Sequence, residues 1–394
     1  MQGNISMETV SKFMPIFFTE LERDGQIDRA MAAARGAIRE REDWWVPALF
    51  MSLKRGRLSW YSPGFESKDQ QAEFQRWKSL VGAITSRNCT PILGSGLLEP
   101  VVGSFRDLAR KLADEQKYPM AGPSREDLPL VAQFIAFDQS KSFARSEFES
   151  ALLAGTLQQS GRDLTDAVKA GPVMDVISAA AAVRRAQGFD DAHEMLAALQ
   201  LPVYVSTNPD NLMADALVSP TRKPRVELCP RHAFDEDATG DLDYTPTPAE
   251  PLVFHLFGQL SDPTSVVLTQ DDYFQFLIDY TNNKSSVPRT VRRRLTKAAL
   301  LFLGFEISDW DFRVLFRSIM TGEGREQLKE FSHVAVQIDP ERDGSLDPAR
   351  AKAFLQRSFG TDVPFDIFWG SAEDFLKQLQ EHLPPELQWK SDHV

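Results

Sequence analysis

The chain has 394 residues and a formal net charge of −12 at pH 7, with 42% hydrophobic and 25% charged residues. This composition is that of a globular protein of one or two domains, and the negative charge argues against a general binder of nucleic acids or anionic membranes. No run of about 18 apolar residues occurs and no secretion signal is seen, so we expect a cytoplasmic protein. The two cysteines, Cys89 and Cys229, form no Cys-x-x-Cys pair, so we expect no disulfide framework and no metal site.

The first 65 residues have a pattern of their own. Apolar residues at helical spacing predict a helix over 7–22, and the Ala-rich stretch 24–42 predicts a second amphipathic helix. Residues 44–61 predict two strands around a Lys-Arg-Gly-Arg turn, and the polar stretch 62–71 predicts a linker. We therefore place a small N-terminal α/β segment at 1–65.

Residues 72–380 have the pattern of a Rossmann-like parallel sheet. A helix is predicted at 74–84, and a mostly helical insertion runs from about 105 to 200. Several apolar runs are continuous rather than alternating, as strands buried on both faces require, and helical segments separate most of them. The pattern predicts an α/β fold with helices on both faces of the sheet, and an exposed, acidic loop at 229–251. The apolar runs after the first, Pro91-Ile92-Leu93, are 201–208, 251–258, 265–269, 298–305, 332–339 and 363–370.

Glycine or polar residues follow four of these runs, and ligands of parallel sheets bind beyond the carboxyl ends of the strands. Gly94-Ser95-Gly96 could offer backbone N–H groups to a phosphate, or could form a plain tight turn. Asn208 and Asp210 suit ribose hydroxyls or a positioned water. An Asx turn that caps the next helix is the alternative for this pair.

Three other features near the strands have two readings each. His255 lies inside an apolar strand, where a hydrogen-bonded core histidine is commoner than a catalytic one. Glu306 could face a ligand, Asp309 suits the N-cap of the next helix, and Asp311 is expected to be a capping or solvated acid. The basic stretch 288–295 is expected to be a solvated helix face, with a local phosphate contact as the alternative.

Taken together, these motifs resemble a sirtuin-like domain of the bacterial kind over about residues 80–320. The matches are Gly94-Ser95-Gly96, Thr207-Asn208-Pro209-Asp210, Phe257-Gly258, the stretch 268–277, and Gly304-Phe305-Glu306 with Asp309. Relatives of this kind in bacterial anti-phage defence bind NAD and cleave its nicotinamide–ribose bond. The resemblance implies the same fold and NAD as substrate or ligand, with no metal.

The resemblance also implies roles for single residues. Asn208 and Asp210 would orient the ribose and a water, and His255 is the candidate for proton transfer. Three departures leave a second function open. Phe257 stands where the family has its catalytic His, Leu98 where the glycine loop carries a Ser, and Glu306 where a Ser usually follows Gly-Phe. A non-catalytic NAD- or ADP-ribose-binding module, or a scaffold, is that alternative. The residues expected to bind NAD are Gly94, Ser95, Gly96, Thr207, Gly258, Gly304, Glu306 and Asp309.

Two further expectations concern partners and the N-terminal segment. A homo-oligomer or a partner defence protein is expected, whereas a membrane or nucleic acid is not. The stretch 7–61, with its two helices, the WWVPALFM strand and a returning strand, resembles the C-terminal end of a CHAT (caspase-like) domain. This stretch lacks the catalytic Cys and His of a CHAT protease, so the resemblance implies that it is a remnant of such a domain. A small helical cap with a hairpin is the alternative.

Overall fold

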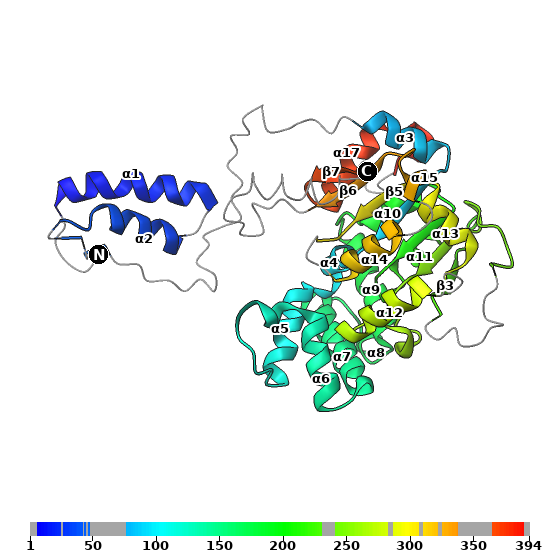
Figure 1. The fold of residues 1–394 in the computed structure, drawn as a ribbon, viewed down its shortest axis with the longest axis horizontal. Helices are drawn as coiled ribbons and strands as arrows, with labels where there is room; N and C mark the ends of the chain where they lie inside the picture. Colours follow the sequence, from blue (N-terminus) through cyan, green and yellow to red (C-terminus); the bar gives the residue numbers. More distant parts are fainter. Residues whose placement is uncertain are drawn as a thin grey trace. The chain divides into compact units, whose positions relative to one another are not determined.

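The computed structural model of the chain describes residues 6–24, 27–41, 43–44, 46–47, 76–230, 241–282, 287–306, 310–321, 325–337 and 365–389. The chain divides into two compact units, one with the N-terminal helices and one with the sheet (Figure 1). None of the described helices is both long and apolar enough to cross a bilayer.

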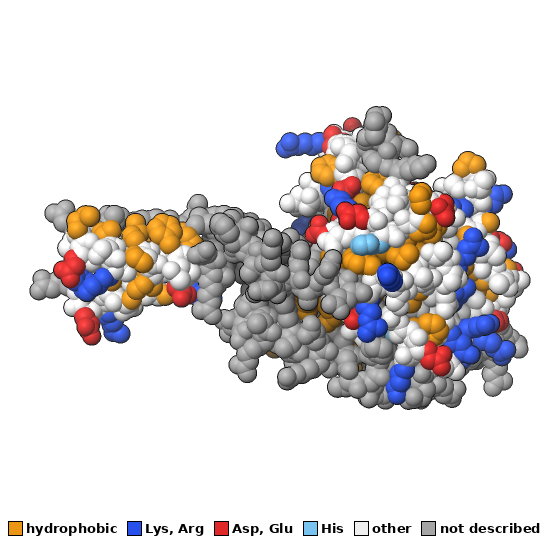
Figure 2. Space-filling model, turned by 90° about the horizontal axis from the view of Figure 1, so that it is seen from above, with side chains coloured by type: hydrophobic (Ala, Val, Ile, Leu, Met, Phe, Trp, Pro, Cys, Tyr) orange, Lys and Arg blue, Asp and Glu red, His pale blue; other side chains and the backbone are white. Residues whose placement is uncertain are grey.

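The N-terminal unit is a pair of helices. α1 (Met7–Asp24) and α2 (Ile27–Ala37) pack together around Phe13, Ala34 and Ile38. α1 also exposes apolar side chains, among them Met7 and Phe18, and Figure 2 shows hydrophobic side chains along this unit. The strands expected at 44–61 lie almost entirely outside the described residues, so the CHAT-like resemblance and the domain boundaries stay predictions.

The second unit is built on a seven-stranded sheet in which all neighbouring strands are parallel. The strand order is β3-β4-β2-β1-β5-β6-β7. Every residue of β1, β2, β4 and β5 is buried, which explains why their sequences are continuous apolar runs. The predicted α/β fold is confirmed. The strands are β1 (Cys89–Leu93), β2 (Val203–Ser206), β3 (Arg225–Leu228), β4 (Leu252–His255), β5 (Ala299–Leu303), β6 (His333–Gln337) and β7 (Phe365–Trp369).

Helices cover both faces of the sheet (Figure 1). Side chains on one face pack against α3 (Trp77–Thr85), α10 (Ala192–Ala198), α11 (Leu212–Leu217) and α17 (Ala372–His382). Those on the other face pack against α12 (Gln270–Asn282), α13 (Arg289–Thr296), α14 (Trp310–Thr321) and α15 (Arg325–Leu328). The layers are therefore helix, sheet, helix.

The expected helical insertion lies between β1 and β2 and has a hydrophobic core of its own. Val102, Leu152 and Ile177 from three of its helices are fully buried there. Its helices are α4 (Glu99–Val102), α5 (Phe105–Glu115), α6 (Leu128–Asp138), α7 (Lys141–Ser160), α8 (Asp166–Lys169) and α9 (Val173–Ala186), with α10 completing the segment.

Two local predictions were wrong. The run 265–269 is not a strand but follows a 3-10 turn, Pro263–Ser265, and its apolar side chains are buried against two different cores. β3 was missed because it is a half-exposed edge strand whose polar residues, Arg225 and Glu227, interrupt the apolar pattern. A hydrophobicity pattern predicts strands from buried residues. It therefore predicted a strand at 265–269, which is buried but unpaired, and missed β3, which is paired but only partly buried.

A pair of helical glycines tests how tightly the insertion packs. A Cβ on Gly155 of α7 would lie 2.1 Å from the Val102 carbonyl oxygen, whereas a Cβ on Gly82 of α3 would meet nothing within 4 Å. We expect Gly155→Ala to lower the free energy of unfolding by about 2 kcal/mol or more. Gly82→Ala should raise it by about 0.5–1 kcal/mol, because Ala is the better helix former. Urea unfolding of the full chain measures both, and a neutral Gly155→Ala would contradict the close approach of α4 and α7.

Candidate functional site

The predicted site residues converge at the carboxyl edge of the sheet. Leu93, the last residue of β1, is paired with Ser206 of β2 and with Leu303 of β5. Ser206 is in turn paired with His255, the last residue of β4. The segments that begin at Gly94, Thr207, Leu256 and Gly304 therefore leave four adjacent strands side by side.

The turns after β1 and β5 are in direct backbone contact. The N–H groups of Gly94 and Gly96 donate to the carbonyl oxygens of Leu303 and Gly304, both at 2.8 Å. A Cβ on Gly94 would lie 2.6 Å from the Gly304 oxygen, and Gly304 has a φ of +74°, which favours glycine. The two N–H groups thus hold the turn to β5, and a pyrophosphate at this edge would need other donors.

Asn208 and Asp210 are both 3% exposed in the loop after β2. The Asn208 Nδ2 donates to the Gly94 carbonyl oxygen at 2.9 Å and so joins this loop to the glycine turn. The Asp210 Oδ1 accepts from the Leu212 N–H at 2.7 Å at the start of α11, as the Asx-turn reading expects. The Oδ2 of Asp210 is buried and has no hydrogen-bond partner among the described residues. A buried carboxylate oxygen is costly without a donor, so this atom fits a water or a ligand group.

His255 is held on both sides. Its Nδ1 lies 2.9 Å from the Asn208 carbonyl oxygen, and because a carbonyl only accepts, Nδ1 carries the hydrogen. Its Nε2 then accepts from the Gln259 side-chain Nε2 at 3.3 Å. Burial lowers the pKa of His255 below its ordinary value. The ring is therefore neutral at pH 7 and fixes the backbone of Asn208.

Gln259 is a site residue that the sequence analysis missed. It is buried, and its side-chain amide also lies 3.1 Å from the Asn211 Oδ1 and 3.3 Å from the Asp210 carbonyl oxygen. It therefore links β4 to the Asn208–Asp210 loop. Gln259 directly follows the Phe257-Gly258 motif in the sequence, and this position could have identified it as a candidate.

Phe257 points into an aromatic cluster. It is 2% exposed, and its ring centroid lies 5.3 Å from that of Tyr273 and 4.9 Å from that of Phe276. The next residue, Gly258, has a φ of +83°, and a Cβ there would lie 2.2 Å from the Ser265 carbonyl oxygen. The turn after β4 thus requires a glycine, and Phe257 supplies packing and no proton.

Charged residues lie where β5 and α5 meet this edge. Arg106 of α5 forms an ion pair with Glu306, which follows β5. Glu99 accepts a hydrogen bond from the Phe105 N–H at 3.2 Å, and burial raises the pKa of its carboxyl. Arg106 therefore brings a guanidinium to the edge. The sequence analysis did not single out this residue. Asp309 lies outside the described residues.

The expectation that Asp311 is solvated was wrong. Asp311 is buried, and its Oδ2 lies 3.0 Å from the Thr207 Oγ1, which is itself 3.0 Å from the Leu93 carbonyl oxygen. The single hydroxyl hydrogen of Thr207 can satisfy one of these two acceptors. A protonated Asp311 would donate to Thr207 and complete the chain to Leu93. Burial raises the pKa of Asp311 to about 6, in keeping with this arrangement.

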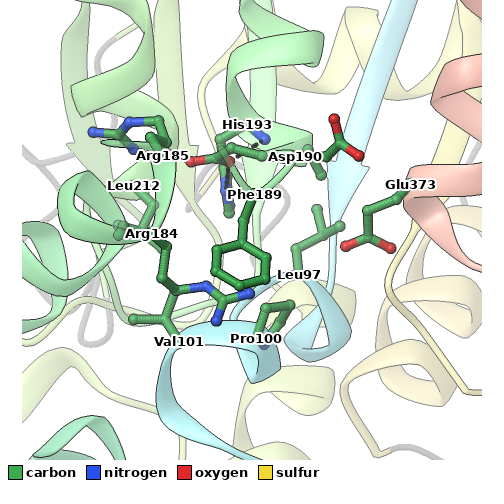
Figure 3. Close-up of a pocket in the computed structure, with 13 residues that line it drawn as sticks. Leu97, Pro100, Val101, Arg184, Arg185, Phe189, Asp190, His193, Leu212 and Glu373 are labelled. Carbon is green, nitrogen blue, oxygen red and sulfur yellow. Dashed lines mark hydrogen bonds and ion pairs between the residues drawn. The ribbon is translucent and has the colours of Figure 1, made fainter. Parts of the chain in front are cut away.

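Two hollows lie near the edge. A pocket of about 20 Å³ (Figure 3), room for about one water, is lined by Leu97, Pro100, Phe189 and His193, with Arg184 stacked on Phe189 at 4.7 Å. A cleft of about 830 Å³ beyond β3 and β4 is lined by α12 and by the segment after His255. The cleft has the size of a ligand site, but Asn208 and Asp210 are not among its lining residues.

No group of three His, Cys, Asp or Glu side chains within the described ranges could hold a metal ion.

His193 is buried beside the pocket of Figure 3. Burial opposes a charge on His193, yet the hydrogen bond of its Nδ1 to Asp191 at 3.0 Å and the charge of that carboxylate raise its pKa. Asp191 is the N-cap of α10, where its side chain accepts a hydrogen bond from the His193 N–H, so this pair has a structural role.

Comparison with known proteins points to the same edge. The SIR2-like domain family matches residues 202–359, a range that contains Asn208, Asp210, His255 and Gly304. A protein named NAD(+) hydrolase ThsA, from Enterococcus faecium, is 27% identical over 117 residues. The similarity covers 30% of this chain and 22% of that protein's length. The expected likeness to a sirtuin-like domain is thus supported for 202–359, while the glycine turn lies outside the matched range.

The buried Asp311 gives a pH-dependent stability. Its folded pKa of about 6 is above the ordinary 3.8, so the folded state takes up a proton that the unfolded chain does not, and stability rises as pH falls through 6. Asp311→Asn mimics the protonated acid. We expect it to raise the free energy of unfolding by about 1–3 kcal/mol at pH 7.5 and by little at pH 5.

Asp175→Asn is the matched control for this measurement, because Asp175 is an exposed carboxylate on α9. Denaturant unfolding at the two pH values should show no pH-dependent gain for it. Equal effects of the two variants, or a loss of stability in Asp311→Asn at pH 7.5, would contradict the buried acid.

Proposed function

We propose that this chain binds NAD at the carboxyl edge of its sheet and hydrolyses it to nicotinamide and ADP-ribose. The observation that carries the proposal is the buried Oδ2 of Asp210, which has no partner in the described part of the chain and lies in the loop of Asn208. The match of 202–359 to the SIR2-like domain family supports it, as does the name of the E. faecium relative.

In the proposed reaction the bond between the ribose C1′ and the nicotinamide nitrogen breaks, and its electron pair neutralises the charge of the pyridinium. A water adds to C1′ and loses a proton to solvent. Positive charge develops on the ribose, and a carboxylate stabilises it most where water is excluded. Asp210 is the buried carboxylate that supplies this charge, and Asn208 holds its loop against Gly94.

The residues around this pair have proposed supporting roles. Gly94, Gly96 and Gly304 shape the turns, and Ser95, Thr207, Gly258, Glu306 and Asp309 are retained as NAD-binding residues. We add Arg106, whose guanidinium suits a pyrophosphate. His255, proposed from the sequence as a proton-transfer residue, has both ring nitrogens engaged, so we assign it the positioning of Asn208.

The proposed biological role is taken from the resemblance to sirtuin-like proteins of bacterial anti-phage defence. Loss of NAD would stop metabolism in an infected bacterium, so we propose an anti-phage effector. A homo-oligomer or a partner defence protein is proposed as its regulator. The chain spans 22% of the relative's length, so the relative's whole activity is carried over as a proposal.

A specific observation favours the second candidate, a module that binds NAD or ADP-ribose without turnover. Phe257 is packed against Tyr273 and Phe276 where the family has its catalytic histidine. Such a module would keep the loop of Asn208 and Asp210 for binding. The two candidates differ in nicotinamide release.

The test is an NAD assay on the purified full chain, with nicotinamide and ADP-ribose followed by chromatography. We expect release by the wild type and a loss of at least about 100-fold in kcat for Asp210→Asn, since one oriented charge contributes on the order of 10²–10³. This variant keeps an oxygen for the Leu212 N–H, so its fold should persist. Asn208→Ala should also lose activity.

Asp175→Asn removes the same charge far from the edge and should keep full activity. Full activity in Asp210→Asn or Asn208→Ala would overturn the site. A melting shift with NAD in the absence of nicotinamide release would select the non-catalytic module. If NAD caused no melting shift and no nicotinamide were released, both candidates would be rejected.

A further inference from the structure

A row of exposed cations stands on α13. Arg289 and Arg293 are four residues apart on the helix, and Lys297 follows after four more; all three are exposed. Arg289 and Arg293 are about 6 Å apart along the axis, at 1.5 Å per residue, and Lys297 is the C-cap residue directly after α13. We call these three residues the cationic row.

The row is not ion-paired to any described residue. Within the described ranges, none of its members is in an ion pair, although Asp241 lies near Arg289 and accepts a hydrogen bond from the Thr290 N–H at 3.0 Å. Arginines elsewhere on the surface do pair with carboxylates, for example Arg110 with Glu126 and Arg225 with Glu250. Although the Asp241 carboxylate lies near Arg289, no member of the row is ion-paired within the described part of this acidic chain, so the row can bind another anion.

Two more cations extend the row toward β1. The Arg294 guanidinium donates to the Arg87 carbonyl oxygen at 2.8 Å, which ties α13 to the segment before β1. Burial and the neighbouring charge of Arg293 lower the pKa of Arg294, and the side chain of Arg87 is exposed. Arg87 precedes β1 and Arg294 lies near the end of α13, shortly before β5, so this end of the surface lies at the amino edge of the sheet. The helix itself packs on one face of the sheet.

We propose that the cationic row binds the sugar–phosphate backbone of a nucleic acid. Guanidinium groups match phosphate oxygens in shape and charge, and the step of about 6 Å from Arg289 to Arg293 suits two successive phosphates of one strand. α13 carries no aromatic residue that could stack on a base, so binding should be independent of sequence. The negative charge of the whole chain opposes general binding, and the inference is confined to this surface.

The row is independent of the proposed NAD chemistry. It is on the exposed side of α13, and no described contact joins it to the groups assigned to hydrolysis. A nucleic acid could therefore occupy it while NAD is bound. This makes the row an interaction surface in its own right, and its test needs no enzymatic activity.

The experiment uses the full chain and a labelled 20-nucleotide single strand of mixed sequence, titrated at several salt concentrations by fluorescence anisotropy. We expect saturable binding whose log affinity falls with log salt at a slope of about −2 to −3, as three to four phosphate contacts give on a single strand. Arg289→Ala/Arg293→Ala/Lys297→Ala should weaken binding at least tenfold and flatten the slope.

The control, Lys117→Ala/Arg162→Ala/Lys223→Ala, removes the same number of exposed positive charges elsewhere and should change the affinity by less than about twofold. Unchanged melting temperatures verify the fold of both variants. Absence of binding by the wild type at 50 mM salt, or equal losses in both variants, would overturn the proposal. So would a poly-glutamate that binds the row more tightly than the oligonucleotide, which would assign it to an acidic protein.

Discussion

The backbone contact between the turns after β1 and β5 is the constraint on which the rest of the site depends. Gly94 and Gly304 approach so closely that a Cβ on either would meet a main-chain atom of the other turn. The hydrogen bonds from Gly94 and Gly96 to β5 use this proximity. Because the Gly94 carbonyl is thereby fixed, the Asn208 amide has a rigid acceptor. A side chain at either glycine would move the whole loop of Asp210.

Around this contact the structure buries polar groups and pairs nearly all of them. Gln259 satisfies His255, His255 satisfies the carbonyl of Asn208, and Asp210 caps α11 with one oxygen. The network stiffens a loop that no regular strand pairing supports. Within this network of described residues, the Oδ2 of Asp210 is buried without a hydrogen-bond partner, and this is the atom to which we assign a water or ligand group.

Much of the fold followed from the sequence because parallel strands buried on both faces leave continuous apolar runs, as in β1 and β5. The edge strand β3 left no such run, and the buried segment 265–269 left one without pairing. The candidate site was predictable as a set of strand ends, because the parallel topology brings these ends together. The sequence could not reveal that Asp311 is buried, that the glycine N–H groups bind β5, or that Gln259 reaches three neighbours, because each depends on packing between segments far apart in the chain.

The resemblance to a sirtuin-like domain expects a histidine where this chain has Phe257, and this difference bears differently on acyl transfer and on the proposed hydrolysis of NAD. Acyl transfer needs a base that removes a proton from a hydroxyl, and an aromatic ring cannot do so. Hydrolysis of a pyridinium glycoside has a leaving group that departs neutral and needs no proton. Its transition state carries positive charge on the ribose and is stabilised by a negative charge nearby, which a buried carboxylate provides. The aromatic cluster of Phe257 with Tyr273 and Phe276 is therefore compatible with the role proposed for Asp210.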